Sequence, residues 1–441
     1  MKPNIIFYFS DQQRWDTLND TLMPNVTALG EAGVRFDNMF TCQPVCGPAR
    51  ACLQTGTYAT QNRCYWNGIP LAETTKTLAH YFNENGYDTA YIGKWHLASD
   101  RYPGRGLHCE KTAVPKSRQG GYKYWRAADV LEFTSHGYDG YVFDEDGKRI
   151  DFTGYRADCI NDFALEYIEK HDSEKPFFMF VSQLEPHHQN DRHHFEGPRD
   201  TVERFSSYPI PDDLSFLNGD YNEEYPDYVA SIHSLDENVG RLIAKLKQKG
   251  IYDDTIIIYT SDHGCHFKTR NAEYKRSCHD SCVHIPLVLG GGAIKKRKAQ
   301  DCLVSLIDIP PTLLHLAGIK IPYSYAGTII PYRDDTQLKE RDCVFIQISE
   351  SQIGRAVRTH KWKYSARGIG SGQMGHRASV YFDDFLYDLE NDPCEKINLI
   401  CDKAYKDILL QMRNLLIREM TNAGENKPII LPRKVVIRKE R

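Results

Sequence analysis

The sequence lacks the features that would place it in several common classes of protein. Among its 441 residues, no stretch approaches the roughly 18 consecutive apolar residues that a membrane-spanning helix needs. Lys and Arg number 55 against 59 for Asp and Glu, so the net charge of −4 indicates no surface for nucleic acid or an anionic membrane. Internal repeats and low-complexity tracts are absent. We therefore expect an ordinary globular protein that binds neither nucleic acid nor membrane.

Thirteen cysteines are scattered along the chain, but no CxxC pair occurs among them. Zinc-ribbon and thioredoxin-like sites, which use that spacing, are therefore unsupported. The apolar run at residues 5–9 is too short for the core of a secretory signal, and it leads straight to Asp11. We expect mostly reduced thiols, a buried first strand and a cytoplasmic location.

Apolar β-rich runs alternate with helical patterns along much of the chain. The runs at residues 5–9, 89–92, 176–184 and 255–260 are continuous rather than alternating in polarity. Residues 228–249, just before the last run, carry apolar side chains at helical spacing. Continuous apolar strands separated by helices are typical of a sheet that is covered on both faces. We predict an α/β fold with a large, mixed, mostly parallel sheet between layers of helices.

The pattern changes after about residue 320. Short strand patterns at residues 343–348, 361–364 and 380–387 precede one long helical pattern at residues 403–422. Residues 102–126 and 365–378 are rich in Gly, Ser, Tyr and Arg and are expected to be long loops, which in compact domains are usually functional or mobile. We predict a main domain over residues 1–320 and a C-terminal α+β subdomain over residues 321–441, with a small antiparallel sheet and a long helix.

Ionisable side chains follow several predicted strands at their carboxyl ends, which is where open α/β sheets bind ligands. These segments are Asp11-Gln12, Lys94-Trp95-His96, His187-His188 and Asp262-His263. Asp11, Asp262 and His263 offer the oxygen and nitrogen ligands that a divalent cation uses. Each Asp alone could instead cap the helix that follows it. Because both border the same predicted cleft, we favour a metal site.

Cys46 lies in the segment Cys46-Gly47-Pro48-Ala49-Arg50, and Thr55-Gly56 closes the next turn. A cysteine beside Gly and Pro at a predicted helix start could be a nucleophile with a low thiol pKa. It could equally be a small buried core residue, which is the commonest fate of a free cysteine. The local motif leaves both interpretations open.

The order of these motifs resembles that of the type I sulfatases, the formylglycine-dependent family of the alkaline-phosphatase-like superfamily. Residues 46–50 match the family's Cys-x-Pro-x-Arg signature, and the similarity covers nearly the whole chain. The other matching elements, in the family's order, are residues 3–6 leading to Asp11, residues 93–96, Pro186-His187, residues 261–264, Lys275 eleven residues before Pro286, and residues 386–389. The resemblance implies an alkaline-phosphatase-like fold and the hydrolysis of sulfate esters.

The resemblance also implies a covalent modification of Cys46. In the family, a formylglycine-generating maturation enzyme oxidises this cysteine, and the hydrate of the product is the nucleophile. A geminal diol can attack sulfur with one hydroxyl and then use the other to collapse to the aldehyde and release sulfate. The implied ligands of one divalent metal are Asp11, Gln12, the modified Cys46, Asp262 and His263.

The implied catalytic residues are Cys46, Arg50, Lys94, His96, His187 and Lys275. Arg50 and Lys94 match positions that hold the diol and the metal ligands, and His96 matches the position that assists deprotonation or collapse of the diol. His187 and Lys275 match positions that contact the sulfate and protonate the leaving oxygen. Taken singly, these could be solvated lysines and semi-buried histidines, but their order beside matching neighbours favours the catalytic roles.

The sequence departs from the family at several positions. Gln12 stands where many members have a second Asp, so the metal site loses one negative charge. His263 stands where Asn is common, and imidazole suits transition metals better than an amide does. We expect Ca²⁺, with Mg²⁺ or Mn²⁺ as alternatives. His279 and His284 stand where Tyr and Arg are frequent. We make no prediction for the effect of these two changes or for the role of His188.

The loop between Asp262 and Lys275 is polar, which fits either a sugar-binding rim or a solvated loop. The substrate contacts that we expect come from His266, Lys268, Arg270, Glu273 and His279. The expected substrate is a sulfated small molecule or oligosaccharide, as in glycosaminoglycan degradation, cleaved in the exo mode. A 6-O-sulfated N-acetylhexosamine is the first candidate.

Two alternatives remain open. One is a phosphonate monoester or phosphodiester hydrolase of the same superfamily, whose members also carry Asp-Gln and a Cys-Gly-Pro-Ala-Arg core. The presence of both Lys94 and His96 argues against it, because sulfatases use that arrangement around the diol. The other is a catalytically inactive homologue that keeps the pocket and binds glycans.

Overall fold

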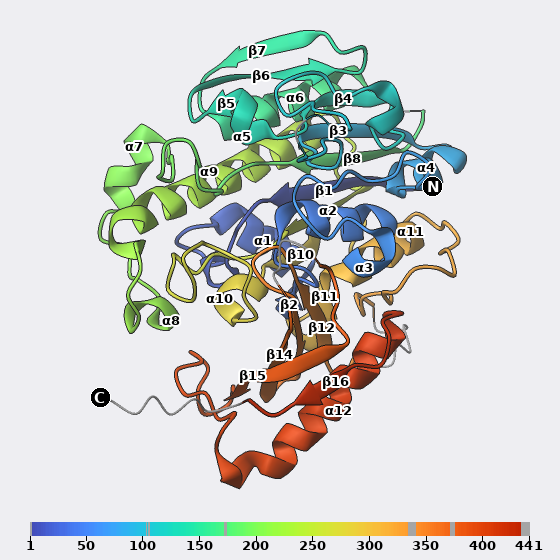
Figure 1. Cartoon of the computed structure of the whole chain (residues 1–441). Helices are drawn as coiled ribbons and strands as arrows, with labels where there is room; N and C mark the ends of the chain where they lie inside the picture. Colours follow the sequence, from blue (N-terminus) through green and yellow to red (C-terminus); the bar gives the residue numbers. More distant parts are fainter. Residues whose placement is uncertain are drawn as a thin grey trace.

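The strand predicted at the start of the chain lies in the middle of a large sheet (Figure 1). β1 (Asn4–Ser10) pairs in parallel with β9 (Thr255–Ser261) on one side and with β8 (Phe177–Ser182) on the other. β3 (Asp88–Lys94) and β4 (Tyr124–Ala128) extend the parallel region beyond β8. Every residue of β8 and β9 is buried, which explains their continuous apolar sequences.

The structure is a computed structural model that describes residues 2–102, 104, 106–171, 174–333, 341–370 and 375–433. Parts of the two predicted loops, at residues 103, 105 and 371–374, lie outside these described residues. Within them, no helix is both long and apolar enough to cross a membrane. All thirteen cysteines are free thiols, as expected.

Both edges of the large sheet contain antiparallel strands. The strand order is β11-β2-β10-β9-β1-β8-β3-β4-β6-β5, with β7 paired to β6. The edge strands are β2 (Val34–Phe40), β5 (Ser135–His136), β6 (Asp139–Asp144), β7 (Arg149–Thr153), β10 (Leu287–Gly290) and β11 (Gln300–Ser305). The predicted mixed, mostly parallel sheet is confirmed. The predicted end of the first loop, at residue 126, is wrong, because β4 already begins at Tyr124.

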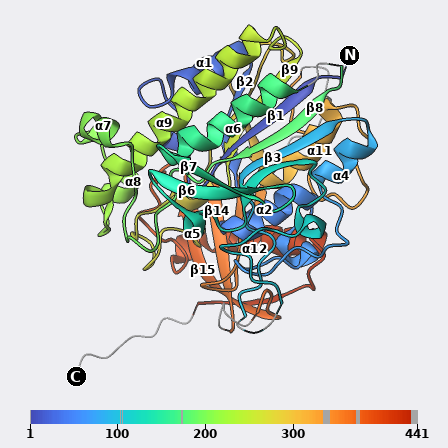
Figure 2. The ribbon, with the colours of Figure 1, turned by 90° about the horizontal axis from the view of Figure 1, so that it is seen from above.

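Helices cover both faces of the large sheet (Figure 2). One layer holds α1 (Pro24–Ala32), α6 (Arg156–Lys170) and α9 (Tyr221–Gln248), and the other holds α2 (Cys46–Thr55), α4 (Leu78–Glu84) and α11 (Ile309–Leu316). Side chains of β1 alternate between the layers, with Ile6 and Tyr8 in one apolar core and Phe7 and Phe9 in the other. Helix α9 starts seven residues before the prediction, since Pro226 lies inside it and obscures its beginning.

A smaller sheet follows, with the order β12-β13-β14-β15-β16. Its strands are β12 (Val344–Ile348), β13 (Gly354–Arg358), β14 (Trp362–Gly368), β15 (Val380–Asp388) and β16 (Ile429–Leu431), and α12 (Lys406–Asn422) follows β15 in the chain. All pairs are antiparallel except β15 with β16. The second predicted loop begins after residue 368 rather than at residue 365, because β14 runs to Gly368. The domain boundary at residue 320 stays a prediction.

Short helices fill several connections: α3 (Ala59–Asn62), α5 (Leu131–Thr134), α7 (Arg199–Val202), α8 (Asp212–Ser215) and α10 (Asp280–Val283). Helix α10 matters for the arrangement of the two sheets. Its Asp280 accepts a hydrogen bond from Lys363 of β14, and Lys363 also donates to Glu395, with 2.6 Å between Nζ and Oε1. Arg358 of β13 lies 3.4 Å from the second Asp280 oxygen. A buried cluster of ion pairs therefore joins the small sheet to the rest of the chain.

Candidate active site

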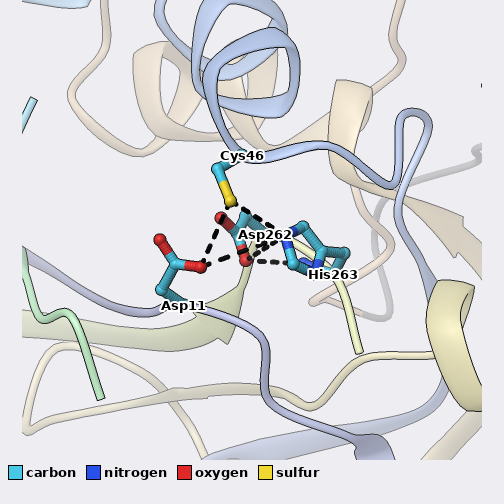
Figure 3. Close-up of side chains that lie close together, drawn as sticks. All are labelled: Asp11, Cys46, Asp262 and His263. Carbon is cyan, nitrogen blue, oxygen red and sulfur yellow. Dashed lines mark hydrogen bonds and ion pairs between the residues drawn. The ribbon is translucent and has the colours of Figure 1, made fainter. Parts of the chain in front are cut away.

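Four predicted metal ligands meet at one end of the large sheet (Figure 3). The register of β1 against β9 pairs Ser10 with Ser261, so Asp11 and Asp262 leave neighbouring strands at the same level. Cys46 and His263 complete the group, and one ligand atom from each of the four residues lies within 4.8 Å of the others. All four residues are buried, so solvent cannot compensate their charges.

The atoms of this group fit a divalent cation. Nδ1 of His263 lies 2.9 Å from the carbonyl oxygen of Gly264, which can only accept, so Nδ1 carries the hydrogen and Nε2 presents a lone pair. Oδ2 of Asp262 is buried without a hydrogen-bond partner among the described residues, and an Arg50 nitrogen lies 3.8 Å away. Burial and the nearby Asp11 carboxylate raise the pKa of Asp262 to about 7. A bound cation would offset the repulsion between these two carboxylates.

Gln12, the remaining predicted ligand, has a left-handed backbone with φ of 73°. Its backbone N–H donates to Oδ1 of Asp262 over 2.9 Å, and its side-chain nitrogen donates to the sulfur of Cys265 over 3.4 Å. Gln12 also lines the cleft at Cys46. Because its nitrogen is directed at Cys265, the amide oxygen is the atom that could bind a cation.

Cys46 begins α2 and places its sulfur at the centre of the polar group. Sγ lies 3.4 Å from Oδ1 of Asp11, 3.2 Å from Nε2 of His263 and 2.7 Å from Nζ of Lys275. The residue is buried but belongs to none of the apolar core clusters. Burial and Asp11 raise the pKa of the thiol to about 12, so the encoded cysteine is protonated at neutral pH.

Arg50 and Lys94 lie on the other side of Asp11, each with a nitrogen 2.9 Å from its Oδ2. Arg50 also donates to the carbonyl oxygen of Lys94 and to Oγ of Ser182, which links α2 to the ends of β3 and β8. Burial alone would raise the pKa of Asp11, but Lys94 and Arg50 outweigh it and hold that pKa well below its usual range. Asp11 is therefore anionic, and two cations hold it in place.

Lys275 and His187 form a pair beside the sulfur, with 3.1 Å between Nζ and Nε2. Nδ1 of His187 lies 2.6 Å from the carbonyl oxygen of His188, so Nδ1 donates and Nε2 accepts from Lys275. Burial and Lys275 hold the pKa of His187 well below its usual range. Lys275, whose own pKa is raised by Cys46 and Asp11 in spite of burial, carries the proton of this pair.

His96 lies just after β3 in a left-handed conformation with φ of 60°, and it lines the cleft. Asp129 holds this turn, because its carboxylate accepts hydrogen bonds of 2.8–3.0 Å from the backbone of residues 97–99. Asp129 belongs to no motif in the sequence, although it directly follows a strand, as other residues of the site do. Within the described part of the chain, Nδ1 of His96 is buried without a hydrogen-bond partner.

Gly47 allows the first turn of α2 to approach this region closely. A Cβ at this position would lie 3.1 Å from Oδ1 of Asn67 and 3.2 Å from the carbonyl oxygen of His96. The Asn67 oxygen accepts a hydrogen bond of 2.9 Å from the Gly47 backbone. The glycine of the motif therefore has a packing reason that the sequence alone does not state.

Only Lys268 and Glu273 of the predicted substrate-binding residues line the cleft. The other three are committed elsewhere, which corrects the expectation that they contact substrate. His266 is fully buried with Nε2 directed at the Lys275 backbone, Arg270 donates to the backbone of residues 394 and 395, and His279 contacts the Tyr387 hydroxyl. Polarity in a loop does not distinguish side chains that face a cleft from those that support the loop.

The cleft has a volume of about 290 Å³ and contains residues that the sequence did not single out. The additional lining residues are Asn67, Glu132, Asn190, His193, Ala272, Tyr274 and Arg276, together with His188, whose role was left open. Asn190 and His193 lie in the same loop as His187, so the strand-end signal could have found them. Glu132 and Asn67 carry no local signal of this kind.

The remaining histidine of the motif region has a structural role. His284 stacks against Trp15 and Phe40, with ring centroids 4.6 and 4.5 Å away. Its Nε2 lies 2.8 Å from the carbonyl oxygen of Asp37, so it donates a hydrogen bond there. His284 does not line the cleft that contains Cys46.

Comparison with known sequences matches two family models, "Sulfatase" over residues 3–319 and "N-sulphoglucosamine sulphohydrolase, C-terminal" over residues 272–422. An uncharacterised sulfatase of Escherichia coli, YidJ, is 28% identical, with 95% of this chain and 87% of the relative covered. An N-acetylglucosamine-6-O-sulfatase of Bacteroides thetaiotaomicron is 25% identical, with 97% and 88% covered.

Solved structures share the fold. One, determined in complex with its substrate D-glucosamine-2-N,6-O-disulfate, has a TM-score of 0.77 at 23% identity, with 97% of this chain and 99% of that chain covered. A phosphonate monoester hydrolase of Agrobacterium radiobacter has a TM-score of 0.67 at 21% identity, with 96% of each chain covered. Since the sulfatase model spans more than half of the chain, and the motif residues converge on one cleft, the protein belongs to the sulfatase family and is a sulfuric ester hydrolase.

Proposed function

We propose that the protein is an exo-acting carbohydrate sulfatase whose substrate is a 6-O-sulfated N-acetylhexosamine. The observation that carries this proposal is the position of Cys46 between a metal-binding group and the Lys275–His187 pair. A cleft of about 290 Å³ suits a terminal sugar better than the interior of a polymer. The named N-acetylglucosamine-6-O-sulfatase among the relatives supports the choice of sugar and of sulfate position.

In this proposal one divalent metal would be held by Asp11, Gln12, Asp262, His263 and the modified Cys46. We expect Ca²⁺, with Mg²⁺ or Mn²⁺ as alternatives. When bound, the metal would lower the pKa of the diol and neutralise charge on the sulfuryl oxygens. A maturation enzyme must first convert Cβ of Cys46 to an aldehyde, with loss of the sulfur and with an external oxidant. Hydration of that aldehyde gives the nucleophile.

Different residues around Cys46 then carry out the separate proton transfers of the reaction. One hydroxyl of the diol gives its proton to water and attacks sulfur, while the bond from sulfur to the sugar oxygen breaks. Lys275 gives its proton to that leaving oxygen, and the neutral His187 holds the lysine in position. His96 takes the proton of the second hydroxyl as the aldehyde re-forms and sulfate departs. Arg50 and Lys94 keep Asp11 ionised and fixed throughout.

Mass spectrometry of the protein co-expressed with a formylglycine-generating enzyme tests the nucleophile. The tryptic peptide covers residues 36–50 and contains both Cys42 and Cys46, so fragment ions must place the mass loss on Cys46. A Cys42→Ala variant is the matched control and should keep the modification. Activity from a preparation in which Cys46 is wholly unmodified would disprove the formylglycine mechanism.

A panel of esters tests the substrate class. We expect the highest kcat/KM on 6-sulfated N-acetylhexosamines, lower values on other sulfated sugars and aryl sulfates, and the lowest on phosphonate monoesters. Gln12 and the fold shared with a phosphonate monoester hydrolase make that activity the second candidate. Higher turnover of phosphonates than of every sulfate would replace the first proposal. Glycan binding by the fully modified protein without turnover of any ester would support the inactive alternative.

A further inference from the structure

Glu132 places a carboxylate at the cleft that neither the metal group nor the proton transfers use. It lies in α5, three residues after Asp129, and only 5% of its surface is exposed. Oε1 accepts a hydrogen bond of 3.1 Å from Nζ of Lys94. Oε2 is buried and has no hydrogen-bond partner in the described ranges, although Glu132 lines the cleft beside His96 and His187.

The charge of Glu132 is not required to neutralise Lys94, because Nζ of that lysine also lies 2.9 Å from Oδ2 of Asp11. Burial alone would raise the pKa of Glu132, but Lys94 outweighs it, and the pKa is lowered. The carboxylate is therefore ionised at neutral pH, with one oxygen able to accept. A buried acceptor with no partner is unfavourable, and a ligand that brings a donor removes that cost.

The backbone around Glu132 is held firmly, so its side chain is a fixed part of the cleft wall. The side-chain nitrogen of Gln189 donates to the Glu132 carbonyl oxygen over 2.9 Å, which joins α5 to the loop that carries His187. Gln189 in turn accepts from the buried Arg156 over 3.1 Å. An acceptor on such a rigid support selects between ligands rather than adapting to them.

We propose that Glu132 is a specificity-determining residue of this sulfatase. Its Oε2 accepts a hydrogen bond from a hydroxyl or amide N–H of the sugar that bears the sulfate. Its negative charge disfavours sugars that carry a second sulfate or a carboxylate in place of that hydroxyl or amide, because like charges in a buried site repel strongly. The preferred substrate is thus charged only at the sulfate that is removed. This inference rests on the proposed function and narrows it.

The test compares three substrates in the wild type and in Glu132→Gln, both normalised to the formylglycine content. N-acetylglucosamine-6-sulfate supplies donors, 4-nitrophenyl sulfate supplies none, and glucosamine-N,6-disulfate adds a second anion. In the variant, the ratio of kcat/KM for N-acetylglucosamine-6-sulfate to kcat/KM for 4-nitrophenyl sulfate should fall by about 10-fold or more relative to the wild type. The ratio of kcat/KM for glucosamine-N,6-disulfate to that for N-acetylglucosamine-6-sulfate should rise. Glu145→Gln, which removes a carboxylate paired with Arg126 outside the cleft, is the matched control and should leave both ratios unchanged.

An equal loss on all three substrates would overturn the inference, since Glu132 would then only position Lys94. The wild type alone offers a second test that does not depend on the folding of a variant. It should hydrolyse the N-acetylated sugar at least about 10-fold more efficiently than the disulfated one, and the reverse preference would also overturn the inference. Turnover of no sulfate ester by fully modified wild type would instead refute the proposed function.

Discussion

Two buried clusters of charge in this protein differ in how completely their carboxylates are paired. In the cluster between the sheets, both oxygens of Asp280 accept from cations, one from Lys363 and one from Arg358. Both oxygens of Glu395 are paired as well, with Lys363 and with the Asp280 backbone. In the cleft, by contrast, Oδ2 of Asp262 has no hydrogen-bond partner among the described residues. The same holds there for Oε2 of Glu132.

This difference distinguishes a cluster that holds two parts of the fold together from one that is suited to bind a ligand. A buried ionic network in which every carboxylate oxygen is paired resists rearrangement and fixes how two elements pack. Buried polar atoms without partners reduce stability unless something outside the chain binds them. The cluster at Asp280 therefore joins the small sheet to the large one, whereas the unpaired oxygens in the cleft fit the proposed metal and substrate. Replacing a lysine in each cluster tests this distinction most strongly.

Lys275→Met should abolish most activity while the fold survives. We expect kcat/KM to fall by about 10³-fold or more, because the proton donor and a cation near the transferring group are both lost. The free energy of unfolding should change little, since Lys275 contacts the Cys46 sulfur and the His187 ring rather than a carboxylate that depends on it. Steady-state kinetics and chemical denaturation measure the two effects. A large stability loss with normal kcat/KM would contradict the distinction.

Lys363→Met should show the opposite pattern. It leaves Asp280 and Glu395 buried without their shared cation, and we expect the free energy of unfolding to fall by about 3 to 5 kcal/mol. The kcat/KM of the folded fraction should stay close to that of the wild type. Lys361→Met is the matched control, since Lys361 lies two residues away and pairs with Glu390 at the surface. A stability loss from the control as large as that from Lys363→Met would remove the special role of the buried cluster.

The sequence predicted the large sheet and the grouping of Asp11, Cys46, Asp262 and His263, because both depend on local patterns. Continuous apolar runs marked the central strands, and polar residues directly after them marked the candidate ligands Asp11 and Asp262. The partner of Lys94 could not be predicted, because Glu132 reaches it from 38 residues away through a turn without any motif. No local pattern places His279, which lies outside the polar loop at residues 262–275 and is buried against Tyr387 of the second sheet.

The structural role of His284 can be tested by the pH dependence of the free energy of unfolding. Burial lowers its pKa to about 3, below the value of about 6.5 for an unfolded histidine. The unfolded state therefore binds the proton more readily, so this stability is present above pH 6.5 and is lost as the pH falls toward 3. We expect a loss of about 2 to 3 kcal/mol from His284 between pH 7 and pH 4.5. His284→Phe keeps a ring between Trp15 and Phe40, and its unfolding free energy should fall less over that range. Parallel pH profiles for both proteins would contradict the assignment.

Asp262→Asn should have the smallest effect on stability, and its effect should be opposite in sign to that of Asp280→Asn. Without metal, this variant removes one of two adjacent buried carboxylates but keeps an oxygen for the backbone N–H groups of Gln12 and His263. We expect the free energy of unfolding in a chelator at pH 8 to rise by about 1 to 2 kcal/mol. Added Ca²⁺ should stabilise the wild type more than the variant, because the cation binds the folded wild type more tightly. Asp280→Asn is the matched control, and there the loss of one carboxylate should reduce stability. If Asp262→Asn were destabilised and Ca²⁺ did not stabilise the wild type, the Asp262 carboxylate, like that of Asp280, would already have its partners within the chain.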